Sequence, residues 1–150
     1  MRKLSLLLAI VLLVGMLFSL PVFAAPETLP ANTLPMANTI FTVTNPNAQT
    51  ASTSDAYYTI TGYGTQGVKL TFYSLTTFGG YQQIKQNGIP VTWTIGASRL
   101  FAQRIPLLGG RNAIMVVAEK DGQVVQMNAL QITKIVQSTT SRFLGFSLFR

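Results

Sequence analysis

Two acids stand around a lysine and a glycine in VVAEKDGQVV, residues 116–125, between two apolar runs. A pair of carboxylates can divide acid and base roles when a desolvated pocket separates their pKa values. Asp-Gly between alternating apolar runs is instead a strong signal for a tight hairpin, since Gly accepts the positive φ that such turns require. We therefore predict that Glu119 and Asp121 lie at a solvated hairpin tip and do no chemistry.

The chain offers few other residues for catalysis or metal binding. It has no histidine and no cysteine, and its remaining acids are Glu27 and Asp55. Ser and Thr are plentiful but have no His base, and no Lys stands beside a Ser in a helix-borne pattern. The acids are too dispersed for a hard-cation cage, and nitrogen and sulfur ligands are nearly absent. We therefore expect no enzyme activity, no metal and no cofactor.

Residues 1–24 have the pattern of a secretory signal peptide. Arg2 and Lys3 precede the apolar run LSLLLAIVLLVGMLFSL, and Pro21 follows it just before the small-residue exit VFAA. We expect a helix in this leader and cleavage after Ala24. An uncleaved anchor is the alternative, since about 20 apolar residues can span a bilayer. The leader predicts a secreted or cell-surface protein that meets the membrane only transiently.

Residues 25–136 divide into two parts. Residues 25–38 contain three prolines and no sustained period, which is typical of an extended tether. Residues 39–136 hold seven runs rich in Val, Ile, Thr, Tyr and Phe, separated by turn signals. The runs are TIFTVT, AYYTITGYG, GVKLTFYSLTT, IPVTWTIG, RLFAQRIPLL, RNAIMVVAE and QVVQMNALQITKIV. This pattern predicts an all-β fold, an antiparallel two-sheet sandwich of about seven strands.

Alternation of side chains assigns faces in the last two runs. Ile114 and Val116 share one face of their strand, whereas Met115 and Val117 share the other. Both faces are apolar, so the outer side of this strand is either covered or a contact surface. The last run loses its alternation, which predicts a bulge near Asn128.

Several motifs carry a resemblance to a known family. They are YTITG at 58–62, GVKLTFY at 67–73, Trp93, and IPLLGGRNAIMVVAEKDGQ at 105–123, with Pro46, Ile60, Gly62, Leu107, Gly110, Asn112, Ile114, Val116, Ala118 and Gly122 at the characteristic positions. In these the chain resembles the immunoglobulin-like domains of bacterial exported cell-surface proteins. The resemblance implies a two-sheet module, used for spacing, adhesion or carbohydrate contact, that buries its Trp. Lys120 stands where the family often has an acid, so no calcium site is expected at this turn.

Aromatic residues in a loop form the first candidate binding site. In TFGGYQQ, residues 77–83, Gly79-Gly80 predicts a turn that lifts Phe78 and Tyr81 to its rim. Exposed aromatics of this kind can stack on sugar rings while neighbouring Asn and Gln side chains bond the hydroxyls. Packing in the core is the alternative for both rings.

The tail, residues 137–150, is the second candidate. Its large apolar residues follow a polar spacer and are bracketed by Arg142 and Arg150; they are Phe143, Leu144, Phe146, Leu148 and Phe149. Ten residues are too few to span a bilayer as a helix. The tail could add a strand to its own sheet, dock on a partner or another copy, or lie on a membrane surface.

Composition narrows the classes of partner. The chain carries a net charge of +7, and removing Arg2 and Lys3 with the leader leaves 7 − 2 = +5. The cations are scattered singly, so we expect no nucleic-acid binding. The favoured function is an exported, non-enzymatic module in cell-surface or extracellular-matrix structure, adhesion or assembly, with a cell-wall glycan, a surface protein or a second copy as partner. A carbohydrate-binding module and an accessory or inhibitor subunit of a secreted enzyme are the alternatives.

Overall fold

A computed structural model describes residues 25–36 and 39–136. Short runs of β-branched and aromatic residues, broken by turn residues, form strands throughout this part of the chain. The strands are β1 (Thr28–Leu29), β2 (Phe41–Asn45), β3 (Thr50–Thr53), β4 (Tyr57–Gly64), β5 (Lys69–Leu75), β6 (Tyr81–Gln83), β7 (Lys85–Gln86), β8 (Ile89–Pro90), β9 (Thr92–Thr94), β10 (Leu100–Pro106), β11 (Gly110–Lys120) and β12 (Gln123–Lys134).

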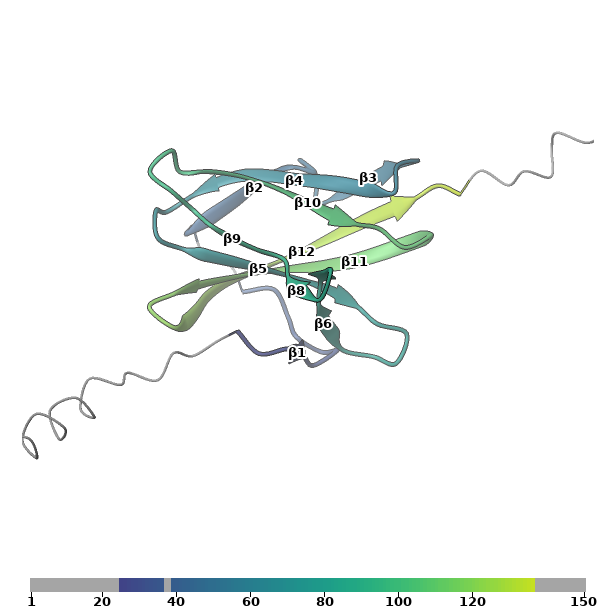
Figure 1. Cartoon of the computed structure of the whole chain (residues 1–150), viewed down its shortest axis with the longest axis horizontal. Helices are drawn as coiled ribbons and strands as arrows, with labels where there is room; N and C mark the ends of the chain where they lie inside the picture. The colour runs from purple at the N-terminus through teal and green to yellow at the C-terminus, as the bar shows by residue number, and fades with distance from the viewer. Residues whose placement is uncertain (1–24, 37–38, 137–150) are drawn as a thin grey trace, which may run out of the picture.

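The strands form two facing sheets (Figure 1). The large sheet has the order β1-β6-β5-β11-β12-β3, with β9 also paired to β5, and the small sheet has the order β10-β4-β2. The pairs are antiparallel except that β3 runs parallel to β12. A two-stranded hairpin, β7-β8, stands apart from both sheets. The prediction of an all-β sandwich is therefore confirmed, and no helix occurs within the described residues.

The core lies between the two sheets. Alternate residues of β4, β5, β10, β11 and β12 point into it, as the period of two requires. Its members are Phe41, Ile60, Val68, Leu70, Phe72, Ile84, Val91, Ile95, Phe101, Ile105, Leu107, Ile114, Val116, Ala118, Leu130 and Ile132. Trp93, which the resemblance placed in the core, packs against this cluster while part of its ring stays accessible.

Residues 25–36 pair with strands of the large sheet, whereas an extended tether was predicted for 25–38. β1 pairs with the edge strand β6, and Met36 forms a bridge with Met127 of β12. The hydroxyl of Tyr73 donates a hydrogen bond of 2.7 Å to the carbonyl oxygen of Pro26. This segment closes a second buried cluster on the outer side of the large sheet, made of Leu29, Tyr73, Met115 and Val117. The outer face of β11 is thus covered by its own chain.

A β-bulge interrupts the β11-β12 hairpin, but at a different place from the one predicted. The register shifts between Ala118 and Glu119, so that Ala118 pairs with Gln126 and Glu119 with Val124. The prediction of a bulge at Asn128 is wrong, because Asn128 pairs regularly with Val116. Within the described residues, no helix is long and apolar enough to cross a membrane.

Gln126 ties the two sheets together from its position beside the bulge. Its side chain is buried, accepts a hydrogen bond of 2.9 Å from the backbone N–H of Phe41, and donates one of 2.9 Å to the Phe41 carbonyl oxygen. Both amide atoms are therefore satisfied by the backbone of a single residue near the start of β2. A buried glutamine of this kind stabilises the sandwich only because each polar atom has a partner.

Candidate functional site

The hairpin at 119–122 is a turn, as predicted, but it does not expose both acids. Asp121 and Gly122 have φ values of 53° and 77° and connect β11 to β12 as a two-residue loop. Positive φ at both positions is the conformation that favours Asp-Gly. Asp121 is exposed, whereas Glu119 is buried with 7% of its surface accessible. The prediction of a solvated tip is therefore wrong for Glu119.

Glu119 lies on the outer face of the large sheet. It pairs with Lys69 of β5, on the same face as Tyr73. Burial raises the pKa of the Glu119 carboxyl group, and the charge of Lys69 opposes this by lowering it. Burial likewise raises the pKa of Tyr73 to about 12, although a hydrogen bond from Gln83 lowers it. Within the described residues no group of three His, Cys, Asp or Glu side chains could hold a metal ion.

The loop between β5 and β6 holds Phe78 in solvent. The backbone N–H of Thr76 donates to the Gly80 carbonyl oxygen at 3.0 Å, and the N–H of Gly79 donates to the Thr76 carbonyl oxygen at 3.2 Å. The Thr76 hydroxyl adds a hydrogen bond of 3.2 Å to the Gly80 carbonyl oxygen. Phe78 stands at the tip with 98% of its surface accessible. Its exposure is therefore imposed by an internally bonded turn.

Tyr81, the partner predicted for Phe78, lies differently. It pairs with Leu75 of β5 on one side and with Leu29 of β1 on the other. Its ring is partly buried against the second cluster, which contains Leu29 and Tyr73. The two aromatics therefore differ in environment, and Phe78 alone presents both ring faces to solvent.

Two hollows flank the Phe78 loop. The outer one has a volume of about 800 Å³ and lies between residues 28–31 and residues 76–82. The other has a volume of about 550 Å³ and is lined by the Phe78 loop and by the turn between β10 and β11. In this second hollow Leu75, Phe78 and Leu108 come together from segments that are distant in sequence.

The turn that carries Leu108 is also pinned by hydrogen bonds. The buried side chain of Asn112 accepts a hydrogen bond of 2.9 Å from the Leu108 N–H and donates one of 2.9 Å to the Leu108 carbonyl oxygen. Its amide also donates to the carbonyl oxygens of Gly110 and Ile132. Leu108 itself is 74% accessible. Asn112 was predicted as part of a family motif, whereas no signal in the sequence marked Leu108 as a contact residue.

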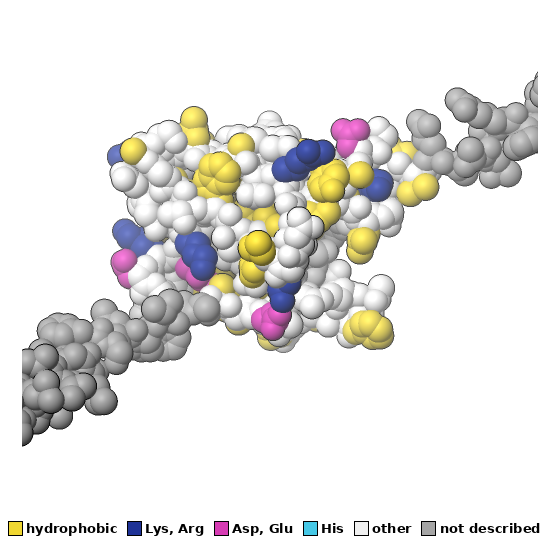
Figure 2. All heavy atoms as spheres, in the orientation of Figure 1, with side chains coloured by type: hydrophobic (Ala, Val, Ile, Leu, Met, Phe, Trp, Pro, Cys, Tyr) yellow, Lys and Arg dark blue, Asp and Glu magenta, His cyan; other side chains and the backbone are white. Residues whose placement is uncertain are grey.

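We name the surface formed by Leu75, Phe78 and Leu108 the apolar end. Leu75 is 42% accessible, so all three side chains present hydrophobic surface. Gln82, Gln83 and Arg111 supply polar groups around them. Figure 2 shows exposed hydrophobic side chains at the end of the molecule where the chain leaves β12. An apolar surface rimmed by polar side chains can bind a hydrophobic segment of another molecule.

The tail residues predicted to mediate association lie outside the described residues, as does the leader. The last described residue, Val136, lies next to the β10-β11 turn, because a Cβ atom added at Gly109 would be 3.1 Å from Val136 Cγ2. The last described residue of the chain therefore lies beside the turn that carries Leu108.

Comparisons with known proteins give few matches. No family model matches the chain, and no curated protein matches it. Among solved structures, the chain is similar to part of an FMN-binding beta-glucuronidase from Facaelibacterium prausnitzii L2-6, at 20% identity and a TM-score of 0.39. The likeness covers 69% of this chain and 12% of that chain. At this TM-score it carries no argument about fold family or activity.

Proposed function

We propose that this chain is an exported, non-enzymatic immunoglobulin-like module that acts in assembly or adhesion at the cell surface or in the extracellular matrix. The connections support the immunoglobulin-like part of the proposal. The chain crosses from β4 in the small sheet to β5 in the large sheet, returns to the small sheet at β10, and crosses again to β11. Such crossings between two antiparallel sheets are those of a Greek-key sandwich.

The observation that carries the proposal is the apolar end. Phe78 and Leu108 each expose most of their side chain on turns that hydrogen bonds hold in place. Full burial of a Phe or Leu side chain is worth about 1.5 to 3 kcal/mol, so covering both yields appreciable binding energy. Because both turns are already held in place, less conformational entropy is lost when a partner binds. The apolar end thus has the properties of a contact surface.

The surroundings of Phe78 support the proposal of assembly or adhesion, rather than carbohydrate binding, at this loop. A sugar platform at the loop was expected to use Phe78 together with Tyr81, but Tyr81 packs partly against the second cluster. Leu75 and Leu108 line the hollow together with Phe78, and their apolar side chains are suited to contact apolar groups. We therefore propose a protein partner, either a second copy or another surface protein, for the apolar end.

The leader and the tail support two further parts of the proposal, export and association. The leader at residues 1–24 supports secretion, and the tail supplies Phe143, Leu144, Phe146, Leu148 and Phe149 as a further association segment. Val136, the last residue before the tail, lies near the turn that carries Leu108. The tail and the apolar end are proposed to contribute to the same contact.

Sedimentation velocity over a range of concentrations tests self-assembly through the apolar end. The variant Phe78→Ser with Leu108→Ser is expected to weaken association by about tenfold or more, since apolar burial is lost at both positions. Ile89→Ser is the matched control, because Ile89 is 70% accessible on β8 and does not line the hollow. Equal association of all three proteins would contradict a role for the apolar end in self-assembly. A wild-type protein that stays monomeric would exclude a second copy as partner.

A further inference from the structure

The small sheet carries an exposed face that the proposed function does not use. Along β4 the outward side chains are Tyr57, Thr59, Thr61 and Tyr63, because their neighbours Ile60 and Gly62 are buried. Exposed Ala102 and Arg104 of β10 lie opposite Thr61 and Thr59. Thr44 of β2 shares a hydrogen bond of 3.2 Å with the Thr61 hydroxyl. We name this surface the threonine face.

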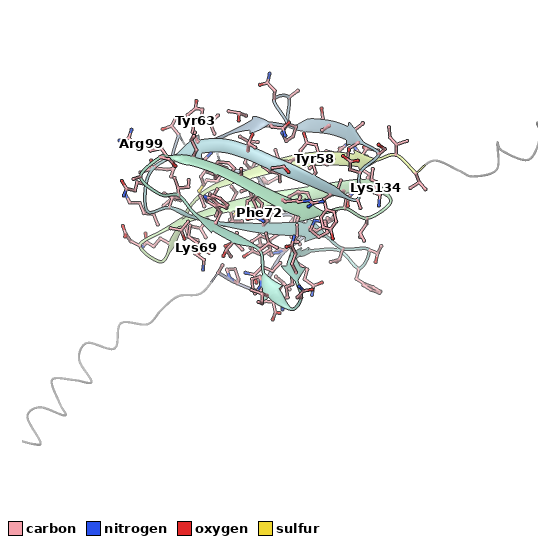
Figure 3. The ribbon with its side chains drawn as sticks, turned by 45° about the horizontal axis from the view of Figure 1, so that its top comes forward. Tyr58, Tyr63, Lys69, Phe72, Arg99 and Lys134 are labelled. Carbon is pink, nitrogen blue, oxygen red and sulfur yellow. The ribbon has the colours of Figure 1, made fainter. Side chains whose placement is uncertain are left out.

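One end of the threonine face is hollowed beside Tyr63. The hollow has a volume of about 350 Å³, and its lining includes Tyr63, Arg99, Thr65 and Gln66. This volume falls within the range of small-ligand sites. Tyr63 is 52% accessible, so a face of its ring is open to a ligand. In Figure 3, Tyr63 and Arg99 lie next to each other at this end of the sandwich.

Arg99 is held at the hollow in a conformation that is uncommon for a bulky residue. Its φ is 60°, in the left-handed region. Its carbonyl oxygen accepts a hydrogen bond of 2.8 Å from Gly64 N–H, and its own N–H donates one of 3.0 Å to the Gly96 carbonyl oxygen. In the part of the chain that the structure describes, the guanidinium group has no acidic partner. A fixed backbone thus presents an unpaired cation beside an open aromatic ring.

A second Tyr and Arg stand at the opposite end of the face. The guanidinium carbon of Arg104 lies 4.2 Å from the centre of the Tyr57 ring, and both line a hollow of about 570 Å³ that also includes Asp55. Tyr57 and Tyr63 are six residues apart on one strand, which corresponds to about 20 Å. The threonine face therefore joins two Tyr and Arg pairs over the length of several linked sugars.

These groups match the chemistry of a charged sugar chain. A Tyr ring packs against the apolar face of a sugar ring, and Arg binds a carboxylate or sulfate through two parallel hydrogen bonds. Thr and Gln side chains bond hydroxyl groups. The charged side chains of β2, β4, β10 and the Arg99 turn are arginines alone. The face is thus complementary to a polyanion, with Asp55 as the nearby exception.

We propose that the threonine face binds an acidic polysaccharide, with a sugar ring against Tyr63 and its anionic group held by Arg99. The proposal does not depend on the apolar end. Calorimetric titration of the protein with polygalacturonate, whose charged groups are carboxylates, and with dextran sulfate, whose charged groups are sulfates, distinguishes a carboxylate from a sulfate as the bound group. Binding of either one, with clearly weaker binding of the uncharged polymer dextran, is expected.

Two variants locate the site. Arg99→Asn removes the charge but keeps a residue that accepts positive φ, and Tyr63→Ala removes an exposed ring, so neither should disturb folding. Each is expected to weaken polysaccharide binding by about tenfold, since a charge-assisted contact or a stacking surface is lost. The matched control Lys120→Gln removes one charge at the exposed hairpin tip and should leave most of the binding. Ile89→Ser, on the exposed β8 and outside both surfaces, should leave binding unchanged.

Three results would overturn the proposal. The first is the absence of binding to both acidic polymers. The second is equal binding of dextran, or of a single-stranded oligothymidylate of matched charge, because the face would then select neither acidic nor sugar ligands. The third is equal weakening by Arg99→Asn and Lys120→Gln, which would show that net charge alone attracts the polymer.

Discussion

Glu119 shows how a residue's environment depends on more than its place in a turn. Two residues separate it from Gly122 at the tip of the hairpin, yet it is buried on the outer face of the large sheet. The Asp-Gly signal located the turn correctly. The burial of Glu119 depends on pairing with β5, which alternation within one hairpin does not reveal.

The buried carboxyl group makes stability depend on pH. Burial raises the pKa of Glu119 above its value of 4.5 in the unfolded chain. The folded protein then keeps a proton that the unfolded chain releases, so stability falls as pH rises from 4.5 through the raised pKa. Glu119→Gln is expected to increase stability at pH 7 and to remove this dependence, as measured by urea unfolding across pH.

Asp121→Asn is the control for Glu119→Gln. Asp121 is exposed and has a φ of 53°, which Asn also accepts. The free energy of unfolding of the Asp121→Asn variant should differ from that of the wild type by about 0.5 kcal/mol or less. A Glu119→Gln protein that is less stable than the wild type at pH 7 would show that the pairing with Lys69 outweighs burial.

Alanine substitutions of Phe78 and Tyr81 are expected to differ in their effect on the free energy of unfolding. Phe78→Ala should change the free energy of unfolding by about 0.5 kcal/mol or less, since its ring is in solvent. Tyr81→Ala should cost about 1 to 2 kcal/mol, less than the roughly 3 to 5 kcal/mol of a fully buried aromatic. Thermal unfolding of the two single variants makes the comparison. Equal losses would mean that the loop packs differently from the description above.

Gly62 of β4 is required because the neighbouring strands β2 and β10 leave no room for a side chain. A Cβ atom at this position would lie 2.6 Å from Cζ of Phe101 and would also overlap the Thr42 carbonyl oxygen. Gly62→Ala is therefore expected to cost about 2 kcal/mol or more in urea unfolding, as overpacked positions do. Gly96→Ala is the control, because nothing lies within 4 Å of a Cβ atom there. If both substitutions had the same small effect, the close packing of β4 against its neighbours would be contradicted.

At the scale of the element, the sequence predicted the long strands and missed the short ones. Each of the seven runs contains a strand, because β-branched and aromatic residues in runs bounded by turns are a strong signal. The strands β1, β3, β6 and β7 have two to four residues, too few to show a period. β1, β3 and β6 form because they pair along strands of the large sheet, whereas β7 pairs with β8 in a separate hairpin. These pairings are properties of the assembled fold.

The segment before β2 was the element predicted least well. Its three prolines suggested an extended tether, but residues 25–36 include a turn, in which Thr33 N–H donates to the Pro30 carbonyl oxygen, and they pair with the large sheet. From the sequence it stayed open whether the apolar outer face of β11, with Met115 and Val117, is covered or is a contact surface. The structure covers it with residues of the same chain. Prolines exclude a regular helix, but they do not determine whether a segment docks.

Leu29→Ala tests whether this segment belongs to the folded unit. Leu29 is 8% accessible in the second cluster, so its truncation should cost about 2 kcal/mol, at the low end for a buried Leu because β1 is short. Leu34→Ala in the same segment should have almost no effect, since Leu34 is 80% accessible. The measurement is urea unfolding of both variants. Two neutral substitutions would return the segment to the role of a tether.

At the scale of the whole molecule, the sandwich class was predictable and the residues of the two proposed binding surfaces were predictable only in part. Phe78 was recognised because Gly79-Gly80 marks a turn beside it. Leu108, which completes the apolar end, comes from another turn that meets the Phe78 loop only in the folded chain. The same holds for Arg99 and Tyr63, which β4 and the turn before β10 bring together.

The two surfaces suggest a division of tasks in one small module. The apolar end is built from turns of the large sheet and the β10-β11 connection, whereas the threonine face belongs to the small sheet. We propose that the first contacts protein and the second contacts polysaccharide. A module with both would link a protein assembly to an acidic matrix.

Fractionation of cells of the native host tests the central proposal of an exported contact module most directly. The wild-type protein is expected to be processed and retained with the cell surface or matrix. The variant Phe78→Ser with Leu108→Ser is expected in the medium in larger amount than the wild type, because the threonine face alone then holds it to the matrix, while Ile89→Ser behaves like the wild type. Retention of the double variant at the wild-type level, or a wild-type protein found inside the cell with residues 1–24 intact, would contradict the account.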